Sequence, residues 1–115
     1  MKDDRLYLIH IMECIIRIEQ YTAEGKDAFF ADRKTQDAVV RNLQILAEST
    51  RRPSNPLTLT RPDVDWRGIA GFRNVAVHDY LGIDTQQIWH IVEHDLPELK
   101  PKIAAILASL EVPSL

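Results

Sequence analysis

Cysteine is almost absent from this chain of 115 residues, which carries only Cys14, and glycine and proline are scarce at four and six. A single thiol forms no internal disulfide and cannot supply a cysteine-based zinc site, so nothing demands an oxidising compartment and we expect a cytoplasmic location. The composition, 45% hydrophobic and 27% charged, excludes collagen-like and low-complexity chains. A chain of this length supports one hydrophobic core, so residues 1–115 are predicted to form a single domain.

Long apolar runs are also missing. The N-terminal residues 1–5 are mostly charged, and the apolar stretch that follows is interrupted by His10, Glu13 and Arg17. This pattern fits neither a signal peptide nor a membrane span. We therefore expect no membrane partner.

Positive charge is in deficit overall, with a formal net charge of −3, but it is unevenly distributed. Residues 41–73 hold six arginines against three acidic residues, which gives +3, whereas the rest of the chain carries −6. A local basic segment can hold phosphates even on an acidic protein. The alternative, a solvated basic loop, stays open at this point.

Apolar residues recur at helical spacing along most of the chain, and no strand-like alternation is long enough to predict a sheet. The first helix is expected over residues 6–21, with Gly25 as its stop signal. Its apolar surface is wide because Ile9, Cys14 and Ile16 lie off the main stripe. The helix is therefore predicted to be central or to meet a second subunit, and Cys14 to be a packed, inert thiol.

The later helices are delimited by capping residues and prolines. After a short turn at Phe29–Phe30, Asp32 is predicted to cap a second helix that ends before Pro53, and a proline-rich loop follows. Further helices are expected from Asp63 or Asp65 to Gly82, from Asp84 through Val92, and over residues 99–110, with a kink or restart at Pro97. The predicted fold class is all-α, a bundle of four to five helices.

The densest polar cluster lies at the end of the third predicted helix, residues 71–82. Arg73 carries a fixed positive fork suited to phosphate, His78 is a side chain that exchanges protons near neutral pH, and Tyr80 supplies a hydroxyl. Phosphodiester cleavage needs these groups. The structural alternative is a helix C-terminus with a cation near the negative end of its dipole and a satisfied histidine.

Helix geometry constrains this cluster. At about 100° per residue, positions five apart differ by roughly 140°, so Arg73 and His78 do not share one face of a regular helix. Either the helix deforms near His78, or two copies of the segment meet across a two-fold axis. A dimer would also account for the wide apolar surface of the first helix.

The pattern Arg73-x4-His78-x-Tyr80 resembles the signature of the HepT-like toxins, a branch of the HEPN superfamily of helical RNases. Four flanking phrases resemble that family too, so the likeness spans nearly the whole chain: residues 34–39, 41–43, 66–71 and 77–80. The resemblance implies a HEPN-type helical bundle that assembles as a homodimer with a composite cleft.

The resemblance also implies a function: a toxin of a toxin–antitoxin system that acts as a metal-independent RNA endonuclease, with no cofactor. Arg73 and His78 would be catalytic, Asn74 would be their polar companion, and a 2′,3′-cyclic phosphate product is expected. The implied partner is a nucleotidyltransferase antitoxin of the MntA type, which would add AMP to Tyr80. The chemistry agrees with the residue types, since a base would deprotonate the 2′-hydroxyl while a cation stabilises the phosphate.

Two alternatives compete with this interpretation. Residues 90–94 match the H-x-x-E-H pattern of inverted zinc peptidases, with His90 and His94 on one helix face, but no third ligand is obvious. A non-catalytic HEPN module that binds a nucleotidyltransferase or a nucleotide would use the same residues without turnover. The aromatic residues Trp66, Trp89 and Phe29–Phe30 are expected to be core or interface anchors rather than base-stacking platforms.

Overall fold

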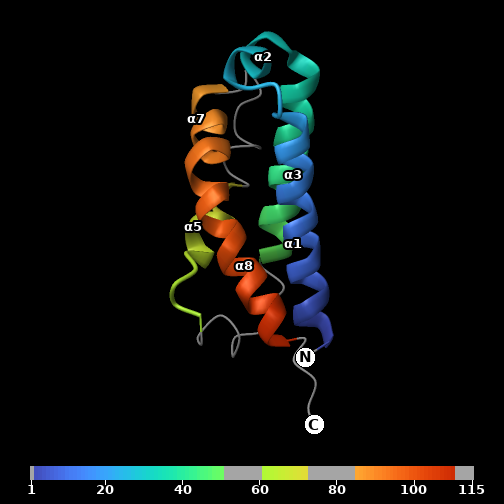
Figure 1. The fold of residues 1–115 in the computed structure, drawn as a ribbon, viewed down its shortest axis with the longest axis vertical. Coiled ribbons are helices and arrows are strands. Elements are labelled where there is room, and N and C mark those ends of the chain that lie inside the picture. Colours follow the sequence, from blue (N-terminus) through green and yellow to red (C-terminus); the bar gives the residue numbers. More distant parts are fainter. Residues whose placement is uncertain (1, 51–60, 73–84, 111–115) are drawn as a thin grey trace.

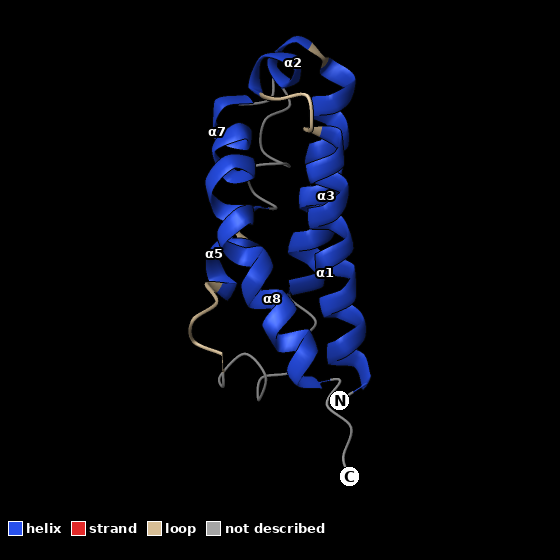
Figure 2. Ribbon diagram, viewed as in Figure 1, coloured by secondary structure: helices blue, strands red, loops and turns tan. Residues whose placement is uncertain are grey.

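The computed structural model describes residues 2–50, 61–72 and 85–110, and within these ranges every regular element is a helix (Figure 2). The elements are α1 (Lys2–Tyr21), α2 (Lys26–Ala31), α3 (Arg33–Thr50), α5 (Trp66–Ala70), α7 (Thr85–His90), the π-helical turn η1 (Ile91–Asp95) and α8 (Leu96–Leu110). The all-α prediction is confirmed.

The long helices α1 and α3 form an antiparallel pair, and α8 packs across α1 (Figure 1). Their contact faces are apolar at helical spacing, which is why these segments are helices and why they associate. An ion pair between Lys100 Nζ and Glu19 Oε1, 2.8 Å long, also joins α8 to α1. The fully buried core side chains include Leu8, Ile11, Ile15, Ile18, Val39, Leu43, Leu46, Ile88, Ile103 and Ile106.

The ends of the first three helices follow local sequence signals. Gly25 has a φ of 98°, a conformation that favours glycine, and the chain turns there into α2. Asp32 caps α3 as predicted, because its carboxylate accepts hydrogen bonds from Lys34 N at 3.0 Å and Thr35 Oγ1 at 2.8 Å. These hydrogen bonds hold the pKa of Asp32 below its usual value, with the Thr35 hydroxyl as the main cause.

The prediction of a simple turn at Phe29–Phe30 is wrong, because these residues belong to α2. Phe29 is fully buried against the bundle, and Gln36 Nε2 donates a 3.0 Å hydrogen bond to its backbone oxygen. Burying one large ring stabilises by about 2–3 kcal/mol. That gain explains why six residues between two longer helices adopt helical structure.

The prediction of a helix restart at Pro97 is wrong, because the π-helical turn η1 joins α7 to α8 without a gap. A proline ring clashes with the carbonyl of the residue four positions earlier, here Glu93, and donates no hydrogen bond. The chain widens by one residue over η1, so that Leu96 N bonds to Ile91 O, five residues back. Helices α7, η1 and α8 consequently run on without interruption.

Candidate functional site

The predicted catalytic and modified residues Arg73, Asn74, His78 and Tyr80 lie outside the described residues, so their geometry stays a prediction. The structure does describe the element that precedes them, α5, and the Phe72 side chain that ends the described range. The local structure up to Phe72 fixes where the chain enters the segment that carries the signature.

Asp65 is the N-cap of α5, one of the two caps that the sequence offered. Its Oδ1 accepts a 2.9 Å hydrogen bond from Gly68 N, which satisfies a backbone donor at the helix start. A side chain at residue 68 would meet this carboxylate, because an added β-carbon would stand 2.7 Å from Asp65 Cγ. Glycine is therefore required for the cap in its observed position.

Two buried apolar side chains anchor α5 to the rest of the bundle. Ile69 is 5% exposed and Phe72 is 8% exposed, and α5 packs on α3. Trp66 lies partly buried against the core, and its Nε1 donates a 3.1 Å hydrogen bond to Arg61 O. Arg73 is therefore the next residue in the sequence after Phe72, whose side chain is buried in the core.

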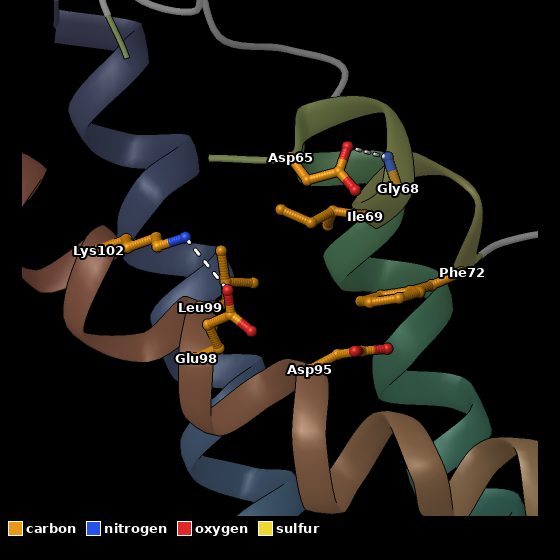
Figure 3. Close-up of a pocket in the computed structure, with 8 residues that line it drawn as sticks. All are labelled: Asp65, Gly68, Ile69, Phe72, Asp95, Glu98, Leu99 and Lys102. Atoms are coloured by element: carbon orange, nitrogen blue, oxygen red, sulfur yellow. Dashed lines mark hydrogen bonds and ion pairs between the residues drawn. The ribbon is translucent and has the colours of Figure 1, made fainter. Parts of the chain in front are cut away.

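A pocket of about 220 Å³ opens beside Phe72, between α5 and the start of α8 (Figure 3). Ile69, Phe72 and Leu99 give it an apolar floor, and Asp65, Asp95, Glu98 and Lys102 surround them. Lys102 Nζ donates a 2.7 Å hydrogen bond to Asp63 O and lies 3.5 Å from Glu98 Oε1. Three carboxylates against one ammonium suit a cationic group and disfavour a phosphate. The residues that line this acidic pocket form no sequence motif, so the pocket was not among the predicted sites.

The basic segment of residues 41–73 is only partly described. Arg41 and Arg67 are exposed, whereas Arg61 is directed to α8, where its guanidinium donates a 3.1 Å hydrogen bond to Ser109 Oγ. Arg51, Arg52 and Arg73 lie outside the described ranges. The arginines of this segment that the structure describes therefore lie on α3, on α5 and in the loop before α5.

Within the part of the chain that the structure describes, the zinc alternative gains no third ligand. His90 and His94 do share a face, with ring centroids 4.6 Å apart, and Glu93 Oε1 lies 3.2 Å from His94 Nε2. Across residues 2–50, 61–72 and 85–110, no group of three or more His, Cys, Asp or Glu is arranged to hold a metal ion.

Cys14 is 1% exposed on α1, as expected for a packed thiol. Burial raises the pKa of its thiol above the usual value, so the reactive thiolate is disfavoured. Among the described helices, none is both long and apolar enough to cross a membrane.

The chain is similar to several proteins that are named as nucleases. It is 38% identical to the probable ribonuclease HepT of Thermococcus cleftensis, over 84% of this chain and 88% of that protein. It is 29% identical to the mRNA nuclease HepT of Shewanella oneidensis, over 85% of this chain and 91% of that protein.

A third relative is longer. A protein of Methanocaldococcus jannaschii, whose name joins a gamma-glutamylcyclotransferase to an RNase, is 33% identical over 96% of this chain, which spans only 50% of that relative. No solved structure gives a significant match. The family model described as Ribonuclease HepT-like matches residues 11–106, which include both α5 and the Arg73–Tyr80 signature. The chain therefore belongs to the ribonuclease HepT-like family.

Proposed function

We propose that residues 1–115 form one catalytic domain that cleaves RNA internally, without a metal ion, as the toxin of a toxin–antitoxin pair in the cytoplasm. The observation that carries the proposal is the position of the signature. Arg73-x4-His78-x-Tyr80 lies inside the range that matches the family, directly after a capped helix and the buried Phe72. An anchored entry suits a catalytic segment, because catalysis needs side chains held in fixed positions.

Each residue has a distinct role in the proposed reaction. His78 removes the proton of a ribose 2′-hydroxyl, and the resulting oxygen attacks the adjacent phosphorus. Arg73 stabilises the negative charge that develops on the phosphate oxygens, and Asn74 adds a polar contact. The P–O5′ bond then breaks, which leaves a 2′,3′-cyclic phosphate and a 5′-hydroxyl that takes up a proton.

The proposed active form is a homodimer. Arg73 and His78 differ by about 140° on a regular helix, so two copies of the segment can complete one cleft that a single regular helix cannot. The exposed apolar side chains on α1, Leu6 at 49% and Ile16 at 40%, support an additional contact surface. Light scattering at micromolar concentration should give twice the monomer mass, and a monomer alone would contradict this part of the proposal.

The proposed regulation is covalent. A nucleotidyltransferase antitoxin of the MntA type would transfer AMP to the Tyr80 hydroxyl, with release of pyrophosphate from ATP. The attached phosphodiester brings bulk and negative charge to a site that receives an RNA backbone, so it should block substrate and occupy Arg73. Tyr80→Phe should retain cleavage and escape this neutralisation. Gain of AMP at another residue of the Tyr80→Phe protein would contradict the assignment.

The central test is cleavage of a labelled RNA in the presence of EDTA. His78→Ala and Arg73→Ala should each lower the rate about a hundredfold or more. His10→Ala, an exposed histidine on α1, is the matched control and should cleave like the unaltered protein. Unchanged cleavage by the His78→Ala or Arg73→Ala protein, or activity that returns only with added zinc, would refute the mechanism. RNA binding without new ends would favour the non-catalytic module.

A further inference from the structure

Helices α2 and α7 lie at the same end of the bundle (Figure 1). Side chains from these two helices and from η1 line a second pocket. Its volume is about 330 Å³, within the range of about 300–1,000 Å³ that is usual for small-ligand sites. The lining residues come from three elements: Lys26 and Phe30 of α2, Gln86, Trp89 and His90 of α7, and Glu93 of η1. None of them belongs to the proposed catalytic signature.

We propose that this pocket, the α2–α7 pocket, binds one nucleotide of a single-stranded RNA substrate. The inference rests on the proposed ribonuclease function and adds a substrate-binding subsite to it. The base would stack on the aromatic wall, and the phosphate would contact the ammonium of Lys26.

The aromatic wall is held in place from behind. The ring centroids of Phe30 and Trp89 lie 6.4 Å apart with their planes inclined at 51°. Both rings contact the fully buried Phe29, at 5.5 Å and 5.3 Å. Phe30 and Trp89 are themselves only partly buried, so each anchors the core and leaves a surface to the pocket. A fixed ring that is partly open is what base stacking requires.

The polar groups around this wall include hydrogen-bond donors that can bind a phosphate. Lys26 Nζ lies 5.9 Å from the Phe30 ring centroid, and such a contact at an exposed site is weak, so the ammonium can turn to a phosphate. Gln86 and His90 add hydrogen-bonding groups to the lining. The one carboxylate in the lining, Glu93, has its Oε1 3.2 Å from His94 Nε2, a polar partner that lies outside the lining.

The backbone at the pocket is irregular. The π-turn η1 begins immediately after His90 and carries Glu93, and π-turns are frequent at functional sites. Gln86 follows His78 by eight residues, a separation of at most about 28 Å for an extended chain. One short RNA strand can therefore occupy the pocket and reach the proposed catalytic residue.

The experiment measures binding of a fluorescein-labelled single-stranded RNA to the full chain carrying His78→Ala, so that the RNA is not cleaved. Adding Lys26→Gln should weaken binding about three- to tenfold and reduce the salt dependence by about 0.7 in slope. Adding Phe30→Leu should weaken binding at least about fivefold. Lys34→Gln makes the same change of charge at an exposed residue of α3 outside the pocket, and it should have a smaller effect.

Circular dichroism of the helical signal checks that each variant is folded, and leucine keeps an apolar side chain at residue 30. If Phe30→Leu unfolds, the salt dependence of Lys26→Gln decides alone. Equal binding by the Lys26→Gln and Lys34→Gln proteins overturns the proposal, as does failure of the His78→Ala protein to bind RNA. Binding that requires added Zn²⁺ and is lost in EDTA overturns it too, and assigns His90 and His94 to a metal.

The two proposals fail separately. If the unaltered protein cleaves RNA but the pocket substitutions leave binding unchanged, only the subsite is refuted. If the unaltered protein does not cleave RNA but binding depends on Lys26 and Phe30, the ribonuclease proposal fails and the pocket stands as an RNA-binding site.

Discussion

The cap of α5 gives a prediction in which two effects of one substitution oppose each other. Gly68→Ala replaces glycine within a helix, which by itself stabilises by about 0.8–1.0 kcal/mol. The new β-carbon, however, would overlap the Asp65 carboxylate and displace it. The 2.9 Å hydrogen bond from Gly68 N to Asp65 Oδ1 is then lost, at a cost of about 1 kcal/mol. The net change should lie within about 0.5 kcal/mol of zero.

A double-mutant cycle separates the two effects. Asp65→Ala alone should cost about 1 kcal/mol, because it removes the cap without adding helix propensity. In that background the carboxylate is gone, so Gly68→Ala should stabilise by about 0.8–1.0 kcal/mol. The coupling between residues 65 and 68 is then about 1 kcal/mol.

Urea unfolding followed by circular dichroism measures the four free energies of unfolding, and 1 kcal/mol corresponds to roughly 4 °C in Tm for a chain of this size. The same effect of Gly68→Ala in both backgrounds would mean that the carboxylate and the β-carbon do not compete. The assigned cap geometry would then be wrong.

Four further predictions concern stability. Leu43→Ala, in the fully buried face of α3, should lower the free energy of unfolding by about 2–5 kcal/mol in urea, and a cost below about 1 kcal/mol would contradict its place in the core. The ion pair of Glu19 with Lys100 is partly exposed and should show a coupling below about 1 kcal/mol in a double-mutant cycle, smaller still in high salt. The pKa of Asp32 is lowered in the folded state, so its carboxylate stabilises the fold at pH values above the unfolded pKa, and this stabilisation is lost as pH falls through the folded pKa. Asp32→Asn should therefore reduce the loss of unfolding free energy at acidic pH. The pKa of the Cys14 thiol is raised in the folded state, so its contribution to the free energy of unfolding is present below the unfolded pKa and declines as pH rises toward the folded pKa. Cys14→Ala should therefore reduce the loss of unfolding free energy at alkaline pH. The same pH dependence of unfolding free energy in both proteins would refute the shift.

The fold class could be predicted from the sequence because its signals are local. Apolar spacing, the cap at Asp32 and the stop at Gly25 act within a few residues. Helix α3 begins directly after the cap and α1 ends before the glycine, as these signals predict. The start of α1 was predicted at residue 6, whereas the helix begins at Lys2. The segment of Phe29 and Phe30 escaped prediction because a six-residue helix has little intrinsic stability. Its structure depends on burial of Phe29 against residues far away in the sequence.

Of the candidate sites, the signature could be recognised in the sequence, whereas the two pockets could not. The signature residues Arg73 and His78 were recognisable because they form a short pattern of chemical groups, and their convergence stays a prediction. The acidic pocket beside Phe72 and the α2–α7 pocket were not recognisable, since each joins side chains from two segments that lie at least 23 residues apart in the sequence. The packing of apolar helix faces determines which distant side chains become neighbours, and this packing is a property of the folded chain. Caps and helical periodicity depend instead on residues that are close in the sequence.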